Sequence, residues 1–152
     1  MEFNPTEIEK PTFESPSVHS YLSILQAVIA RMATNSSSCK TWCITIVSAI
    51  LVVVADKAKP EYVWIAVIPT ILFFGLDAYY LGLERLFRDQ YNAFIRKLHL
   101  NTASIDDVFI VNPGVGPVKV VLAAFRSVAS VSVFPFYLVL IGMVELARRL
   151  IL

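Results

Sequence analysis

The apolar segment Val63–Gly82 contains a single charged side chain, Asp77. At about 1.5 Å per helical residue, a segment of this length covers the roughly 30 Å hydrocarbon core of a bilayer. No glycine or proline follows before Leu98, and large apolar residues recur there at helical spacing. These residues are Tyr80, Leu83, Phe87, Tyr91, Phe94 and Leu98. The pattern predicts one long helix, Tyr62–Leu98, which begins in the membrane and continues into the cytoplasm.

The segment Thr41–Ala55 carries no charge and predicts another membrane-spanning helix. Lys40 precedes it, at a position from which a lysine side chain can extend toward water. The polar turn Asp56–Glu61 separates the two segments, and Pro60 prevents a helix from continuing through it. The two spans are therefore expected to form a hairpin, with a kink in the second at Pro69.

The chain before the hairpin has an amphipathic pattern. Ser15-Pro16 is a helix-start signal, and Val18–Met32 follows with apolar residues at helical spacing. Gln26 and Arg31 interrupt it, so we expect a helix on the membrane surface or packed against the cytoplasmic extension. A fourth span is the alternative. The polar run Thr34–Ser38 predicts a break before the hairpin.

A third span is predicted at Val118–Leu146, of which residues 127–144 carry no charge. Pro135 lies within it and predicts a kink. The segment Asn101–Pro117 before it is predicted to be a loop with a short β-like run, Val108–Val111.

These elements predict an all-α membrane protein with three transmembrane helices, or four if residues 18–32 also enter the bilayer. The expected organisation is a flexible N-terminal arm (1–16) and an amphipathic helix plus transmembrane hairpin with a cytoplasmic helical extension (17–98). A cytoplasmic loop (99–117) and a third transmembrane helix (118–152) follow. The prolines and glutamates of the N-terminal arm differ from a secretory signal, which begins with basic residues and an apolar run.

Composition supports a membrane protein and argues against several other classes. The 152 residues are 57% hydrophobic and 16% charged, less charge than a soluble domain of this size normally carries. A net charge of +1 gives no electrostatic reason to expect nucleic acid binding. Cys39 and Cys43 share one helix face and are interpreted as apolar packing residues, since no histidine lies near them. No catalytic constellation is visible, so we expect neither an enzyme nor a cofactor.

The positions of the basic residues predict the orientation. Four follow the second span and, by the positive-inside rule, place the N-terminus and this extension in the cytoplasm. They are Arg85, Arg88, Arg96 and Lys97. We interpret them as a cytoplasmic partner-binding face, on which Glu84 and Arg88 are spaced for a helical ion pair. Arg148 and Arg149 disagree with this orientation, because three spans would place them outside.

Two charged residues lie within predicted spans at matching depths from the cytoplasmic side. Asp77 is near the cytoplasmic end of the second span, and Arg126 follows Lys119 by two helical turns in the third. We predict that Asp77 and Arg126 form an intramembrane ion pair. Such a pair either fixes how two helices pack or belongs to a pore, an ion path or a switch.

Three short motifs carry a resemblance to a known group of proteins. Lys40–Cys43, Leu76–Arg85 and Phe134–Leu138 resemble segments of small multipass transmembrane effectors encoded in bacterial antiphage defence operons. The resemblance covers roughly Leu22–Leu146. It implies a protein of the bacterial inner membrane that oligomerises and depolarises or disrupts that membrane when infection is sensed. A soluble cytoplasmic sensor protein or a nucleotide signal would supply the trigger.

The sequence therefore supports a membrane effector as the first hypothesis. The alternative is a non-enzymatic membrane anchor or scaffold that recruits a soluble partner. A small transporter is less well supported, because the sequence has no inverted repeat and few intramembrane polar groups.

Overall fold

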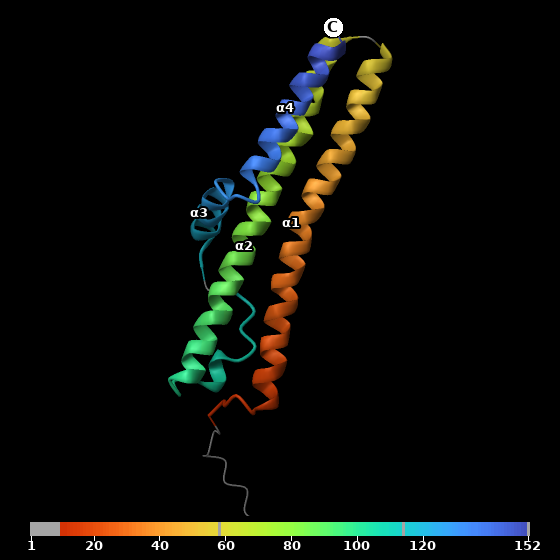
Figure 1. Cartoon of the computed structure of the whole chain (residues 1–152). Helices are drawn as coiled ribbons and strands as arrows, with labels where there is room; N and C mark the ends of the chain where they lie inside the picture. The colour runs from red at the N-terminus through yellow and green to blue at the C-terminus, as the bar shows by residue number, and fades with distance from the viewer. Residues whose placement is uncertain (1–9, 58, 114, 152) are drawn as a thin grey trace, which may run out of the picture.

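The computed structural model of the chain describes residues 10–57, 59–113 and 115–151 (Figure 1). Its elements, in which η marks a 3-10 helix, are α1 (Pro16–Lys57), η1 (Pro60–Ala66), α2 (Val67–His99), η2 (Ile105–Asp107), α3 (Pro117–Val128) and α4 (Phe134–Ile151). The described residues contain helices and no strand, which confirms the predicted all-α class. The run Val108–Val111 is a turn followed by irregular chain, so the β-like interpretation was wrong. Residues 1–9 of the expected N-terminal arm lie outside the described residues.

Helix α1 is continuous over 42 residues, about 63 Å at roughly 1.5 Å per residue. It begins where predicted, since the Ser15 carbonyl accepts hydrogen bonds from the amides of Val18 and His19 at 3.0 and 3.2 Å. The expected break at Thr34–Ser38 does not occur. Serine, threonine and asparagine are only moderately poor helix formers, and no glycine or proline lies between Ser17 and Lys57. Packing against α2 along the whole length outweighs this weak local preference.

The predicted long helix Tyr62–Leu98 is present with a modified beginning. Pro60–Ala66 forms η1, and the α-helical part starts at Val67. Pro69 is therefore in the first turn of α2, where its missing amide costs no intrahelical hydrogen bond. Thr70 adds a side-chain hydrogen bond of 2.8 Å to the Ala66 carbonyl. The expected kink at Pro69 is replaced by this junction between a 3-10 helix and an α-helix.

The end of α2 needs neither glycine nor proline. Asn101 adopts φ = 53°, in the left-handed region that asparagine tolerates better than most residues. Its amide donates to the Leu98 carbonyl at 3.1 Å, and the amide of Thr102 donates to the Lys97 carbonyl at 2.9 Å. These two bonds form a Schellman motif, which satisfies the last carbonyls of the helix and reverses the chain.

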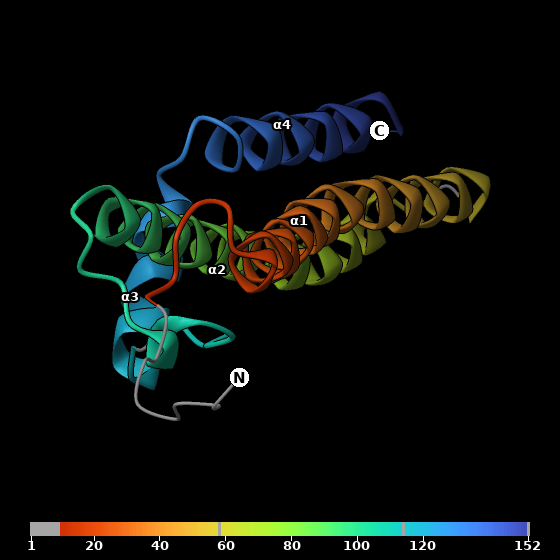
Figure 2. The same ribbon diagram turned by 90° about the horizontal axis from the view of Figure 1, so that it is seen from below.

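Helices α1 and α2 form an antiparallel hairpin that runs the full length of the molecule (Figures 1 and 2). Two separate hydrophobic clusters hold it together. The cluster near the hairpin turn, which we call the upper core, consists of Cys43, Val47, Val54, Val63, Ala66, Val133, Tyr137, Leu140 and Val144. The cluster at the other end, the lower core, consists of Val18, Tyr21, Leu25, Phe94, Leu98, Ala103 and Val108. The amphipathic segment 18–32 thus packs on the extension of α2, one of the two placements expected for it.

The predicted third span Val118–Leu146 is divided into two helices. Helix α3 ends at Val128, and α4 begins at Phe134 with Pro135 in its first turn. In the connection, the Ser130 carbonyl accepts hydrogen bonds from the amides of Val133 and Phe134, both at 3.0 Å. Helix α4 runs beside the upper half of the hairpin, whereas α3 lies across the direction of α1 and α2 (Figure 2). The proline expected to kink a span instead starts a new helix.

Candidate functional site: a buried ion pair in the hairpin

Asp77 is fully buried in the middle of α2, on the side that faces α1. Lys40 Nζ lies 2.6 Å from Asp77 Oδ2, and the Ser36 hydroxyl donates a hydrogen bond to Asp77 Oδ1. Ser36 and Lys40 are four positions apart on α1, so both side chains lie on the same helix face. One carboxylate thus joins two consecutive turns of α1 to α2.

Helix α4 covers this ion pair. The Phe136 ring centroid is 6.0 Å from Lys40 Nζ, close enough for a weak cation–π interaction. The buried Tyr137 hydroxyl lies close to Asp77, without a hydrogen-bond partner of suitable geometry among the described residues. The charges are therefore enclosed by three helices, and 20% of the Lys40 side chain remains exposed.

A pair of this kind holds its two helices in one arrangement. Transfer of a carboxylate and an ammonium group out of water costs several kcal/mol per ion, and only their mutual contact and hydrogen bonds offset this. Loss of one partner leaves the other charge buried and uncompensated, at a cost of about 3–5 kcal/mol. The pair is thus far more sensitive to separation of α1 from α2 than an apolar contact of the same size.

The structure does not form the predicted pair between Asp77 and Arg126. Arg126 is exposed on α3, and the neighbouring Ser127 is the residue that is buried against α2. The prediction failed because it treated α3 and α4 as one spanning helix. The sequence does contain a signal for the correct partner. Lys40 and Asp77 lie equally far along the chain from the polar turn Asp56–Glu61, so an antiparallel hairpin places them side by side.

The four basic residues of the predicted partner-binding face are mostly engaged within the chain. Arg85 donates hydrogen bonds of 3.3 and 3.1 Å to the hydroxyls of Ser127 and Ser130, which attaches α2 to the end of α3. Arg88 forms the expected ion pair with Glu84, with an N–O distance of 2.7 Å.

The other two basic residues lie near the end of α2. Lys97 pairs with Asp107 at 2.6 Å, while Arg96 is exposed. The hydrogen bond from Lys97 holds the pKa of Asp107 below its usual range, and the Ser104 amide adds to this effect. Whether these residues also contact a partner stays a prediction.

Cys39 and Cys43 are both buried on the face of α1 that carries Lys40, and both are free thiols. Cys43 belongs to the upper core, which agrees with its interpretation as a packing residue. Among the residues that the structure describes, no group of three metal-ligating side chains occurs.

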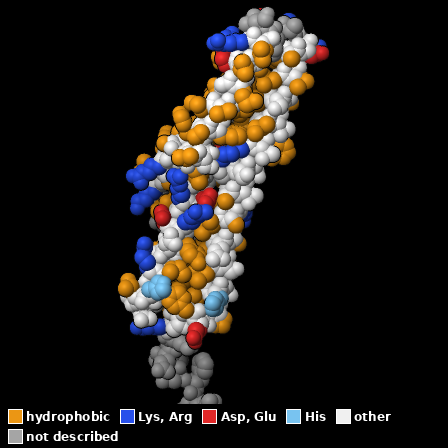
Figure 3. All heavy atoms as spheres, viewed as in Figure 1, with side chains coloured by type: hydrophobic (Ala, Val, Ile, Leu, Met, Phe, Trp, Pro, Cys, Tyr) orange, Lys and Arg blue, Asp and Glu red, His pale blue; other side chains and the backbone are white. Residues whose placement is uncertain are grey.

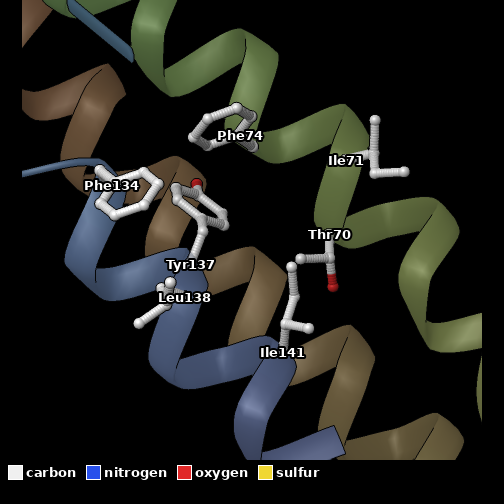
Figure 4. Close-up of a pocket in the computed structure, with 7 residues that line it drawn as sticks. All are labelled: Thr70, Ile71, Phe74, Phe134, Tyr137, Leu138 and Ile141. Carbon is white, nitrogen blue, oxygen red and sulfur yellow. The ribbon is translucent and has the colours of Figure 1, made fainter. Parts of the chain in front are cut away.

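A hollow of about 230 Å³ opens between α2 and α4 (Figure 4). Its lining residues are Thr70, Ile71, Phe74, Phe134, Tyr137, Leu138 and Ile141. The Thr70 hydroxyl is already bonded to its own helix, and the rings of Phe74 and Tyr137 pack edge to face with centroids 5.2 Å apart. The hollow is therefore apolar and offers a polar ligand little to bind.

Two helical segments among the described residues, Pro16–Lys57 and Glu61–His99, are long and apolar enough to cross a membrane. In their most apolar windows only 22% and 28% of the residues are buried, which is unlike the core helix of a soluble protein. On the face shown in Figure 3, exposed hydrophobic side chains gather over the upper half of the hairpin. Exposed aromatic residues mark its two ends, Trp42 and Tyr79 near the ion pair and Tyr62 and Trp64 near the hairpin turn.

The chain matches no protein-family model, no curated protein and no solved structure.

Proposed function

We propose that α1, α2 and α4 cross the bacterial inner membrane, with the N-terminus and the lower half of the hairpin in the cytoplasm. Helix α4 has 18 residues and is about 27 Å long, close to the thickness of the hydrocarbon core. In this placement the C-terminal arginines lie outside, against the positive-inside rule. Glu145 reduces this conflict, because it pairs with both Arg148 and Arg149 at 2.8 and 2.9 Å.

Within this topology we propose that the chain is a membrane effector of a bacterial antiphage defence system. It oligomerises and depolarises the membrane when a cytoplasmic sensor protein or a nucleotide signal acts on the lower half. The observation that carries the proposal is the buried contact between Asp77, Lys40 and Ser36. In the proposed topology this contact lies where the hairpin passes from water into lipid. A trigger that moves α1 relative to α2 would break this contact and expose both charges inside the bundle.

Membrane potential in cells that express the chain tests this proposal. Lys40→Met and Asp77→Asn each remove one partner of the pair and are expected to depolarise the inner membrane without a trigger, as reported by a potential-sensitive dye. Lys57→Met is the matched control, because its ion pair with Asp56 is exposed, with 68% and 75% of the two side chains accessible. It should leave the potential unchanged, since exposed pairs contribute little to stability.

The double variant Lys40→Asp with Asp77→Lys separates the switch from a general folding defect. It restores opposite charges at the same two positions and is expected to return the potential toward that of the wild type. If both single variants reach the membrane at wild-type levels and the potential is unchanged, the effector proposal is contradicted.

A second candidate function is a non-enzymatic anchor that recruits a soluble partner. Three apolar side chains are exposed at the cytoplasmic tip and favour it: Leu100, Ile105 and Phe109. For an anchor, replacing these three residues with serine is expected to release a co-purifying partner, while Lys40→Met leaves the membrane potential unchanged.

A further inference from the structure

Helix α3 is attached to α2 at one close crossing. A Cβ atom added to Gly82 would lie 2.7 Å from the backbone nitrogen of Ala124 and 2.9 Å from the carbonyl carbon of Ala123. The buried Ser127 hydroxyl donates to the Ala123 carbonyl at 2.9 Å and accepts a hydrogen bond from Arg85. Only glycine allows the two backbones to approach so closely, and the contact fixes which face of α3 points away from the bundle.

The outward face of α3 is apolar. Its exposed residues follow helical spacing: Val118, Val121, Leu122 and Phe125. Phe125 is 70% exposed, although a soluble surface rarely displays a ring together with three aliphatic neighbours. At about 100° per residue, Ser127 lies on the opposite side of the helix. The face that packs on α2 is therefore separate from the apolar face that is left open.

Two basic residues flank this apolar face. Lys119 and Arg126 are seven positions apart, so they lie on the same side of the helix. Both are exposed, and neither forms an ion pair with another described residue. On the visible face of the molecule, Lys and Arg side chains gather near the level of α3 (Figure 3).

The level of α3 along the hairpin coincides with the edge of the apolar half. Gly82 and Arg85, which contact it, lie just beyond the exposed Tyr79 and just where α2 becomes charged. The axis of α3 runs across the hairpin, whereas α4 runs along it (Figures 1 and 2). If the hairpin crosses a bilayer, α3 therefore lies roughly in the plane of the membrane surface.

We infer that α3 is an interfacial helix that binds the cytoplasmic leaflet. Its apolar face inserts between lipid headgroups, and Lys119 and Arg126 contact anionic headgroups beside it. Charge complementarity and continuity with the exposed apolar surface of α2 favour a lipid surface over a protein partner. The inference rests on the proposed membrane topology but not on any depolarising activity.

Tryptophan fluorescence of the full chain in vesicles of zwitterionic and anionic phospholipid tests this inference. Trp42 and Trp64, the two native tryptophans, are first replaced with phenylalanine, and Phe125→Trp is added. Brominated lipid is expected to quench roughly half or more of the emission, while acrylamide quenches it weakly. Leu100→Trp in the same background is the matched control, since Leu100 is 71% exposed at the cytoplasmic tip. Acrylamide should quench its emission strongly, and brominated lipid should quench it weakly.

Lipid charge gives the second arm of the experiment. The quantity compared is the ratio of emission protected from acrylamide by lipid to emission that acrylamide quenches. Replacing Lys119 and Arg126 with glutamine is expected to lower this ratio about tenfold or more in anionic vesicles. In zwitterionic vesicles the same replacement should change the ratio little. If the tryptophan of Phe125→Trp behaves like that of Leu100→Trp, the inference is wrong. It is also wrong if protection depends on the ratio of protein to lipid, because that indicates contact with a second copy.

The native tryptophans distinguish failure of this inference from failure of the membrane topology. In the wild-type chain, Trp42 and Trp64 should be quenched by brominated lipid whatever the position of α3. Loss of that quenching would overturn the topology, and with it the premise of the inference. Quenching of the native tryptophans without quenching at Phe125→Trp would overturn the inference alone.

Discussion

The upper and lower halves of the hairpin use the same two helices but are stabilised in different ways. In the lower half, apolar residues are buried and polar contacts join distant parts of the chain. The Tyr21 hydroxyl donates to the Ile110 carbonyl at 2.7 Å, and Gln26 donates to the Tyr91 hydroxyl at 3.2 Å. In the upper half, most apolar side chains point outward, and α4 covers the remaining side. The ion pair of Lys40 and Asp77 separates the two halves.

This comparison agrees with the proposed topology, in which one continuous helix meets two solvents. Water drives apolar residues of the lower core inward, because burial removes them from an unfavourable environment. A lipid environment gives no such drive, because acyl chains are as apolar as leucine, so packing and polar contacts decide how the helices associate. In the proposed topology, the ion pair therefore contributes more to the association of the helices in the upper half than its size suggests.

Among the tests of this difference between the two halves, the largest change in the free energy of unfolding is expected from a cavity in the lower core. Leu25→Ala removes a fully buried side chain and should lower the free energy of unfolding by about 3 kcal/mol. Val47→Ala in the upper core should cost about 1 kcal/mol or less in a lipid environment, because little transfer free energy is lost there. Detergent-induced unfolding of both variants measures the two values. Equal costs would contradict the division into two solvent regimes.

A smaller effect is expected at the crossing of α2 and α3. Gly82→Ala places a methyl group against the backbone of Ala123 and Ala124, and should destabilise the contact by about 1–3 kcal/mol. Faster hydrogen exchange in α3, with α1 unchanged, is the expected signature. Gly75→Ala is the control, since the added Cβ would lie within 4 Å of no atom beyond the neighbouring backbone of its own helix, and it should not accelerate exchange in α3. Equal exchange in the two variants would show that the crossing is not tight.

The smallest effect is the pH dependence of the lower half. Lys97 holds the pKa of Asp107 below its usual range, so the pair contributes stability above the unfolded-state pKa of about 4. That contribution is lost as the pH falls through the lowered, folded-state value. Because both side chains are partly exposed, we expect less than about 1 kcal/mol. After division by the intrinsic exchange rate at each pH, the protection of amides around η2 should fall below pH 4 in the wild type, and Asp107→Asn should remove this pH dependence.

Much of the hairpin was predictable from local patterns. The start at Pro16, the polar turn and the long helix to the end of α2 all follow from prolines and from apolar spacing. The errors arose where a local signal was weighed without its long-range context. Thr34–Ser38 is a weak helix former, yet Ser36 gains Asp77 as a partner, and that contact is visible only when two helices are placed together.

The division of the predicted third span has a similar explanation. Hydropathy averages over residues 127–144 and does not register that Ser130 caps a turn or that Pro135 suits a helix start. The crosswise position of α3 depends on Gly82, which belongs to α2 and is distant from Ala123 in the chain. No pattern within α3 itself reports that contact. The partner of Asp77 can be identified by counting residues outward from the polar turn on both sides. This count applies only if the two helices are antiparallel along their whole length.

The uninterrupted backbone of α1 also allows it to transmit motion from one end of the hairpin to the ion pair. Lys40 lies about 28 Å beyond Tyr21 along the helix axis, at roughly 1.5 Å per residue. No glycine or proline lies between them to bend the helix. A hydrogen-bonded helix resists twisting, so torque applied near Tyr21 is transmitted to Lys40 along the helix. A rotation of α1 about its axis by a fraction of a turn would swing the lysine away from Asp77. In the proposed topology, a small displacement of the cytoplasmic end of α1 would therefore produce an electrostatic change at the membrane surface.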